Sequence, residues 1–353
     1  YYNSIKREKK QGLFYNGFCC RRYDILAVFP DITILIIYRD LVMNRFLKRA
    51  WAEIDLDALE HNYNEIKKLA KGKDILAVVK ANAYGHDDKA VCLKLQELGV
   101  KYYGVSNLWE GEKLRCHGIT GTILTFGYTD EDYFDELLEY GITQTAGSVQ
   151  YAKQLSDYAV SKGVKLPVHI KVNTGMTRVG IDSQQEMLDI LAMPGLDCKA
   201  AYTHFSAADS LDPSDVEYTD RQQEKLMKIA KDKGLLIHSQ NSGGIIYHGD
   251  FGGDIVRAGV ILYGHYPNYP LEVPFDMKSV MTVKSVVSQL KTIPAGTQIS
   301  YGRTYTAEKE MTVAVIPIGY ADGYFRDFSS KGKMLINGVL CNVVGRVCMD
   351  QTI

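Results

Sequence analysis

The sequence predicts an α/β protein, a (β/α)₈ TIM barrel followed by a mostly β C-terminal domain. The first observation is a series of eight short apolar or β-branched segments between residues 75 and 264, each followed by a helix-like stretch. The second is a change after Gly264 to short strands separated by turns such as Asn337-Gly338. Strands that alternate with helices pair in parallel through right-handed crossovers. A doubly wound sheet has the same alternation, so periodicity alone only favours the barrel.

A short strand and an amphipathic helix precede these segments. Residues 53–55 are typical of a strand, and apolar residues recur at three- and four-residue spacing from Leu56 to Leu69. The eight barrel strands are expected at 75–80, 102–106, 121–126, 143–147, 166–173, 198–205, 235–240 and 255–263. The intervening helices include 130–140, 149–161 and 218–233. The C-terminal strands are expected at 280–290, 312–318 and 333–347.

Residues 1–42 precede the domain and need a separate interpretation. Residue 1 is a tyrosine and Met43 lies just before the domain, so we expect Met43 to be the natural start and residues 1–42 a non-native extension or linker. The alternative is the tail of a lost membrane domain, although the apolar run at 32–38 is far shorter than the roughly 20 residues of a membrane span. The expected domains are a barrel over 43–270 and an incomplete β-rich domain over 271–353.

Composition and charge exclude several kinds of partner. A formal net charge of -1 over 353 residues gives no overall field toward nucleic acid or an anionic membrane, so neither partner is expected. The seven cysteines are odd in number and lack C-x-x-C spacing, which argues against a secreted disulfide framework and favours a reducing, cytoplasmic setting. No strand-end loop has the histidine or cysteine spacing of a zinc site, so no metal is expected.

Lys80 is the first candidate functional residue. It follows the first barrel strand, and the carboxyl ends of barrel strands carry the active site. A buried lysine amine loses its proton more easily and can form a Schiff base with an aldehyde. Tyr84 and His86 lie in the same loop. The alternative is an ordinary surface lysine, the usual environment of this residue type.

Polar and small residues also follow the later strands. The segment 171–180 contains Arg178 as a fixed cation between glycines that permit close backbone approach, although a plain turn would use the same glycines. His204 follows the sixth strand and is equally consistent with a satisfied core histidine. Small residues and backbone N–H groups around Ser242 and Gly259 suit a phosphate. A lysine that can bind an aldehyde and a phosphate cradle together indicate pyridoxal phosphate.

Eight separated motifs give the chain a clear resemblance to a known family. They lie at 51–56, 77–86, 171–180, 203–205, 257–264, 300–305, 317–323 and 344–351, with the sequences WAEIDL, AVVKANAYGH, KVNTGMTRVG, THF, RAGVILYG, SYGRTY, PIGYADG and VGRVCMDQ. On these motifs the chain, from about residue 49 to residue 353, resembles the alanine racemase family. Its members are bacterial pyridoxal-phosphate enzymes of fold type III, with an N-terminal barrel and a C-terminal β-domain.

The resemblance implies two catalytic residues. Lys80 would hold the cofactor covalently and act as the acid–base group on one face of the substrate's α-carbon. Tyr301 would be the opposite base, supplied across the interface of a head-to-tail homodimer. Two bases on opposite faces suit racemisation, because one removes the α-proton and the other returns a proton from behind. Without the family, Tyr301 would be interpreted as a buried aromatic residue with a bonded hydroxyl.

The resemblance also implies roles around the cofactor. Arg257 would hydrogen-bond the pyridine nitrogen, and because arginine does not deprotonate, that nitrogen would stay unprotonated and side reactions would be suppressed. Arg178 would face the cofactor hydroxyl and the substrate carboxylate, and Lys171 is often carbamylated in this family to orient that arginine. His238 would support Arg257, and His204 would support Tyr301. The phosphate-binding residues would be Tyr84, Ser242, Gly259 and Val260. The residues of the substrate site and its entrance would be Met349, Cys348, Tyr320, Arg326 and Asp350.

The implied function is the interconversion of L-alanine and D-alanine, which supplies D-alanine for peptidoglycan. The alternative is a serine racemase of the glycopeptide-resistance type, which joins the same two domains to a membrane segment. A non-catalytic pyridoxal-phosphate barrel would lack the β-domain and Tyr301, and related decarboxylases would place a carboxylate where Arg257 stands. The chain ends at Ile353, where the family continues. We therefore expect a truncated C-terminus, a less stable β-domain and weaker cofactor retention.

Overall fold

The computed structural model describes residues 49–268, 271 and 273–353. The predictions about residues 1–42 and Met43 lie outside the described residues. The described chain divides into two compact units. The first unit is residues 60–277, and the second unit is residues 49–59 together with 278–353. No helix in the part of the chain that the structure describes combines the length and hydropathy needed to cross a membrane.

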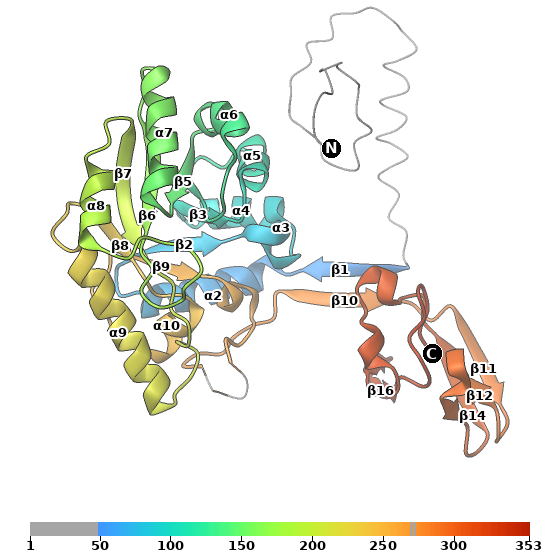
Figure 1. The fold of residues 1–353 in the computed structure, drawn as a ribbon. Helices are drawn as coiled ribbons and strands as arrows, with labels where there is room; N and C mark the ends of the chain where they lie inside the picture. Colours follow the sequence, from blue (N-terminus) through green and yellow to red (C-terminus); the bar gives the residue numbers. More distant parts are fainter. Residues whose placement is uncertain (1–48, 269–270, 272) are drawn as a thin grey trace, which may run out of the picture. The chain divides into compact units, whose positions relative to one another are not determined.

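The first unit contains a closed barrel of eight parallel strands in sequential order, which confirms the predicted fold class. Figure 1 shows its helices around the outside of the strands. The barrel strands are β2 (Asp74–Val78), β3 (Tyr102–Val105), β4 (Thr122–Thr125), β5 (Ile142–Ala146), β6 (Leu166–Lys171), β7 (Leu196–Tyr202), β8 (Leu236–His238) and β9 (Ile255–Ala258). The helices are α2 (Leu56–Leu69), α3 (Lys80–Tyr84), α4 (Asp88–Glu97), α5 (Leu108–Cys116), α6 (Phe134–Glu139), α7 (Val149–Ser161), α8 (Gln184–Leu191), α9 (Pro213–Ala230) and α10 (Ser242–Tyr247), with 3₁₀ turns η1 (Glu131–Tyr133) and η2 (Val260–Tyr263).

Local sequence explains why these elements form. Every residue of β5 is buried, as expected for a barrel strand with side chains inside and helices outside. Helix α7 begins after Ser148, whose side chain accepts a hydrogen bond from the Tyr151 N–H and so caps the helix. Helix α9 starts with Pro213 after the N-cap Asp212, five residues before the predicted start, because proline suits the first turn of a helix.

Several strand predictions are wrong in their ends or their number. The segment 75–80 stops at Val78, and Lys80 belongs to the separate turn α3. The segment 255–263 stops at Ala258, because Gly259 turns the chain into η2. The segment 280–290 is not one strand, since its two ends belong to different sheets. In the first two segments apolar content marks buried chain but does not distinguish a strand from a tight turn, whereas most residues of 280–290 are exposed.

The second unit is mostly β, as predicted. Strand β1 (Ala50–Ile54) pairs antiparallel with β10 (Met281–Ser285). Three further two-stranded sheets are β11 (Gln289–Ile293) with β14 (Met311–Val315), β12 (Gln298–Ile299) with β13 (Tyr305–Thr306), and β15 (Lys333–Ile336) with β16 (Val339–Asn342). Ile299, Val313 and Val344 form the buried centre of a small core. The strand predicted over 333–347 is a hairpin that reverses at Asn337-Gly338, as the turn signal indicates.

Candidate active site

A cavity of about 390 Å³ in the first unit is lined by residues at the carboxyl ends of barrel strands and in the segments that follow them. Its size is that of a small-molecule pocket, and its position is the face where barrel enzymes carry their chemistry. The structure brings together there most of the predicted site residues. These are Lys80, Tyr84, Lys171, Arg178, His204, Ser242, Arg257, Gly259 and Val260.

Lys80 and Tyr84 reach the cavity from one short turn, α3. Its residues from Ala81 to Tyr84 all have positive φ, between 52° and 56°, so the turn is left-handed. The Ala83 N–H donates to the Val79 carbonyl at 2.9 Å, and the Gly85 N–H donates to the Ala81 carbonyl at 3.0 Å. The turn therefore presents an amine at its start and a phenol at its end to the same pocket.

Hydroxyl groups and close-packed backbone gather around Gly259. A Cβ atom on this residue would lie 3.1 Å from the Tyr84 hydroxyl and 3.6 Å from Ser242 Oγ. The Gly259 N–H donates to Ser242 Oγ at 3.1 Å. Burial raises the pKa of Tyr84, so its hydroxyl stays a hydrogen-bond donor at neutral pH. The hydroxyls of Tyr84 and Ser242, beside the backbone N–H of Val260, make a donor set that fits a phosphate.

Arg257 is a buried cation, and both of its terminal nitrogens, Nη1 and Nη2, donate hydrogen bonds within the protein. Nη1 donates to the His238 carbonyl at 2.9 Å and to His238 Nδ1 at 3.1 Å. Nη2 donates to the carbonyls of Thr203 and Ser239 at 2.7 and 2.8 Å, and lies 3.4 Å from His204 Nδ1. No carboxylate in the described residues pairs with it. Burial lowers the pKa of Arg257 to about 10, so the group stays protonated at neutral pH.

The one guanidinium nitrogen of Arg257 without a hydrogen bond to the described residues is Nε, and Arg257 lines the cavity. It can therefore donate to an acceptor in the pocket, such as a ring nitrogen, without supplying a proton to it. Lys80, the residues of the phosphate cradle and Arg257 line one cavity of suitable volume. The residues present thus fit pyridoxal phosphate. No group of three or more His, Cys, Asp or Glu side chains within the described ranges could hold a metal ion.

Two buried histidines, His238 and His169, form a chain of hydrogen bonds that starts at Arg257. Since His238 Nδ1 accepts from Arg257, its Nε2 carries the proton and donates to His169 Nδ1 at 3.1 Å. Burial lowers the pKa of His169 to about 4 and holds the pKa of His238 well below its ordinary value. Burial, with Arg257 and Arg178 nearby, lowers the pKa of His204 to about 3. All three rings are therefore neutral at pH 7.

Sequence reasoning missed His169 and Tyr202. His169 stands two residues before Lys171 on β6, so both side chains lie on the same face of that strand, and this spacing was the available signal. The Tyr202 ring stacks on His238 with centroids 4.7 Å apart and planes at 7°. Its hydroxyl is 2.8 Å from Thr145 Oγ1. Nothing in the local sequence distinguishes Tyr202 from other buried aromatic residues of the barrel.

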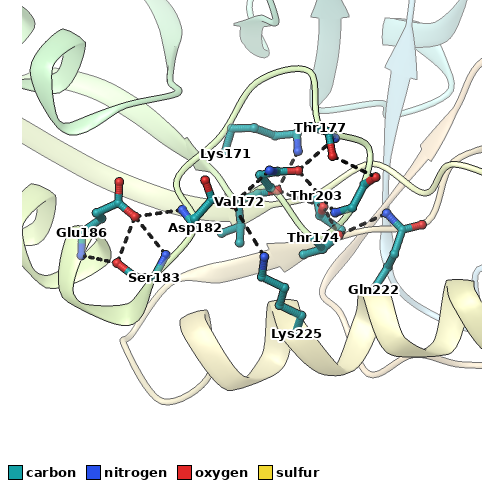
Figure 2. A network of polar contacts seen from close by, with 12 residues as sticks. Lys171, Val172, Thr174, Thr177, Asp182, Ser183, Glu186, Thr203, Gln222 and Lys225 are labelled. Carbon is teal, nitrogen blue, oxygen red and sulfur yellow. Dashed lines mark hydrogen bonds and ion pairs between the residues drawn. The ribbon is translucent and has the colours of Figure 1, made fainter.

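Lys171 and the loop that follows it form the network in Figure 2. Lys171 Nζ donates to the Val172 carbonyl at 2.7 Å, and Thr203 Oγ1 donates to the same carbonyl at 3.0 Å. The hydroxyls of Thr203 and Thr174 are 2.7 Å apart, and Gln222 Nε2 lies 3.3 Å from Thr174 Oγ1. Burial, followed by the charges of Arg257 and Arg178, lowers the pKa of Lys171 to about 7. This network fixes the base of the loop that carries Arg178.

The remaining predicted residues belong to the second unit. A hollow there is lined by Tyr301, Cys348, Met349 and Asp350, among others. Tyr301 is 70% exposed, so in this structure it is not the buried aromatic residue of the alternative interpretation.

Tyr320 and Arg326 are also in the second unit. Tyr320 does not line the hollow, but its N–H donates to the carbonyl of Cys348, which does, at 3.1 Å. Arg326 opens the 3₁₀ turn η5 (Arg326–Phe328) and does not line the hollow.

The models of two protein families match this chain. "Alanine racemase, N-terminal domain" matches residues 54–267, and "Alanine racemase, C-terminal domain" matches residues 280–353. The chain belongs to the alanine racemase family. Members of the alanine racemase family are pyridoxal-phosphate-dependent amino-acid racemases, which agrees with the fit of the barrel cavity to this cofactor.

Individual members of the alanine racemase family are similar over most of their length. An alanine racemase of Clostridium perfringens is 41% identical over 320 residues, which cover 88% of this chain and 82% of that protein. The structure of alanine racemase from Clostridium difficile 630 has a TM-score of 0.81 at 36% identity, covering 87% of this chain and 83% of that one. Alanine racemase from Bartonella henselae, solved with covalently bound pyridoxal phosphate, has a TM-score of 0.76 at 27% identity, covering 86% of this chain and 85% of that one.

Proposed function

We propose that this protein interconverts L-alanine and D-alanine with pyridoxal phosphate bound in the barrel cavity, and so supplies D-alanine for peptidoglycan. The observation that carries the proposal is the common cavity of Lys80, Arg257 and the hydroxyls of Tyr84 and Ser242. When bound, the cofactor supplies an electron sink that weakens the bond between the substrate's α-carbon and its hydrogen. Arg257 limits the strength of that sink, because it offers a hydrogen bond and keeps its own proton.

The residues of this chain would supply the anchoring and the proton transfers. Lys80 Nζ would hold the cofactor through its aldehyde group and would hold a proton on one face of the substrate's α-carbon. We propose that the Tyr301 hydroxyl serves the opposite face and comes from the partner in a homodimer. Its 70% exposure supports this role, because a catalytic phenol must be open to another surface. His238 is proposed to orient Arg257, and His204 is proposed to orient Tyr301.

Lys171 is proposed to react with carbon dioxide. An unprotonated amine is the reactive form, and the lowered pKa of Lys171 makes it available near pH 7. The new bond joins Nζ to the carbon, and the amine proton is released. The resulting anion would orient Arg178, which is proposed to face the cofactor hydroxyl and the substrate carboxylate.

We propose that Met349 contacts the substrate and that Cys348, Tyr320, Arg326 and Asp350 shape its entrance. Tyr301, Cys348, Met349 and Asp350 share one hollow, which supports a common role. A reducing, cytoplasmic setting is also proposed. The cysteines of the described residues support it, because Cys92, Cys116, Cys198, Cys341 and Cys348 are all free thiols.

The test compares two substrates in one preparation. The purified protein with added pyridoxal phosphate should abolish the optical rotation of L-alanine faster than that of L-serine. Lys80→Ala should remove both this activity and the absorption band of the lysine-bound cofactor. Preference for L-serine would favour the alternative function, and an absorption band that survives Lys80→Ala would contradict the assignment of Lys80.

A further inference from the structure

The turn that carries Lys80 has a conformation that its residues do not favour. Ala81, Asn82, Ala83 and Tyr84 have φ values of 52°, 56°, 53° and 55°, and none of them is a glycine. In a left-handed turn each L-residue brings its Cβ too close to the following carbonyl oxygen. Such a turn persists only where surrounding groups hold it.

The carboxylate of Glu110 accepts a hydrogen bond from a backbone N–H of this turn, that of Ala81. Glu110 Oε1 accepts a hydrogen bond from the Ala81 N–H at 2.8 Å, and Oε2 accepts one from the Ser106 N–H at 2.8 Å. Within the turn, backbone bonding begins only at the Ala83 N–H, so the Ala81 N–H depends on this carboxylate. One half-buried side chain thus joins the start of α3 to the end of the neighbouring strand β3.

The position of Glu110 is itself fixed by helix α5. The N-cap residue Asn107 accepts a hydrogen bond from the Glu110 N–H at 3.1 Å. Three residues further along the same helix, Lys113 forms an ion pair with Asp88 at 2.9 Å and lies 3.4 Å from Asn82 Oδ1. Helix α5 therefore holds both the Ala81 N–H and the Asn82 side chain of the turn.

We propose that Glu110 is a positioning residue for Lys80. By holding the left-handed turn it keeps the Lys80 amine directed to the cofactor's aldehyde, so its loss weakens cofactor attachment more than it weakens the fold. This inference rests on the proposed role of Lys80 and extends it to a residue outside the cavity lining. The carboxylate is required because it alone offers an acceptor oxygen to each of the two N–H groups.

Conservative variants of Glu110 distinguish positioning from simple packing. Glu110→Gln keeps the shape but offers one acceptor oxygen, and its NH₂ group opposes the second backbone N–H. Glu110→Asp is one methylene shorter and cannot span both amides. Ala81→Gly removes the unfavourable Cβ contact from the turn, so it should partly rescue Glu110→Gln. Ala81 is exposed, so no side-chain packing is lost in this variant.

The experiment follows the release of pyridoxal phosphate from the holoenzyme by the decay of the lysine-bound absorption band. A charge-assisted hydrogen bond predicts release roughly tenfold faster in Glu110→Gln than in the unmutated protein. Borohydride reduction and peptide mapping measure the fraction of cofactor attached at Lys80. This fraction should fall in Glu110→Gln and partly recover when Ala81→Gly is added.

Two control variants separate this effect from general destabilisation. Lys71→Gly relieves another non-glycine residue at positive φ, 50°, and should give no rescue. Asp212→Ala removes a carboxylate that accepts the Ser214 N–H at the start of α9, and should lower the melting temperature without speeding cofactor release.

Unchanged release and unchanged labelling of Lys80 in Glu110→Gln would overturn the proposal, as would equal rescue by Lys71→Gly. If Glu110→Gln alone does not fold, the Ala81→Gly protein with and without Glu110→Gln gives the same comparison. Failure of the unmutated protein to bind the cofactor at Lys80 would instead contradict the proposed function.

Discussion

At the scale of single residues, the chemistry of the cavity depends on keeping protons in fixed places. Arg257 is buried, charged and bonded through both Nη atoms, and the histidines behind it are neutral. The proton on His238 Nε2 is fixed because Nδ1 already accepts from Arg257, and His169 Nδ1 receives that proton's hydrogen bond. The orientation of the Arg257 guanidinium thus depends on the ring of His169, which lies two residues before Lys171 on β6.

His169 should make the stability of the cofactor-free protein depend on pH. Its pKa falls from 6.5 in the unfolded chain to about 4 in the fold, because burial disfavours the charged ring. Between these values the unfolded state binds more protons, so this contribution is fully present above about pH 6.5 and is lost as the pH falls toward 4. His169→Asn keeps an acceptor for His238 but does not titrate there. Between about pH 7 and pH 5 the unmutated protein should lose about 2 kcal/mol more unfolding free energy than the variant.

Urea unfolding at a series of pH values measures this difference. The remaining slope in His169→Asn should come from the other buried histidines, since burial also lowers the pKa values of His204 and His238. Parallel stability curves for the two proteins would contradict the assignment of His169.

At the scale of elements, the loop after β6 is held closed by backbone contacts around Gly180. Val172 and Ile181 form a β-bridge, and the Asn173 N–H donates to the Ile181 carbonyl at 2.8 Å. Gly180 has φ +131°, and a Cβ there would lie 2.5 Å from the Asn173 nitrogen. Only glycine fits this close approach, so the loop that carries Arg178 depends on it.

Gly180→Ala should therefore destabilise the protein by about 2–4 kcal/mol and weaken cofactor retention, because the added methyl group meets backbone atoms that cannot move aside. Thermal unfolding and the cofactor absorption band measure the two effects. Gly163→Ala is the matched control: it also has positive φ, 69°, but no atom lies within 4 Å of its added Cβ. It should cost about 1–2 kcal/mol and leave cofactor binding unchanged. Equal effects of the two substitutions on cofactor binding would contradict a role for this loop in the site.

At the scale of the whole molecule, the two proposed bases belong to different units of the chain. Lys80 lies in residues 60–277, and Tyr301 lies in the unit that includes 278–353. If Tyr301 acts in the partner's site, two inactive proteins should complement each other. In a mixed dimer of Lys80→Ala and Tyr301→Phe, one site has lost both residues and the other has kept both.

Random re-association of equal amounts of these variants should restore about a quarter of the unmutated activity, because half of the dimers are mixed and each has one intact site. The measurement is alanine racemisation before and after subunit exchange, with each variant alone as the control. Absence of recovery, when mixed dimers are demonstrated by mass spectrometry, would place both bases in one chain.

The sequence by itself determined the barrel, the β-rich second unit and most residues of the cavity. Strand–helix alternation favours the barrel, and Lys80, Arg257 and Ser242 lie at the ends of strands or just after them, in segments whose periodicity is local. The Asn337-Gly338 turn is also local, because those two residues alone supply the backbone angles of a tight hairpin.

Only the tertiary structure decided how these residues are held. Glu110 lies 29 residues after Ala81, and His169 lies 69 residues before His238, so each pair meets only because the barrel closes. The left-handed turn at Lys80 contradicts the preference of its own residues, which no local pattern could predict. Its conformation depends on the Glu110 carboxylate from the neighbouring helix α5. Such long-range contacts produce no periodic pattern in the sequence.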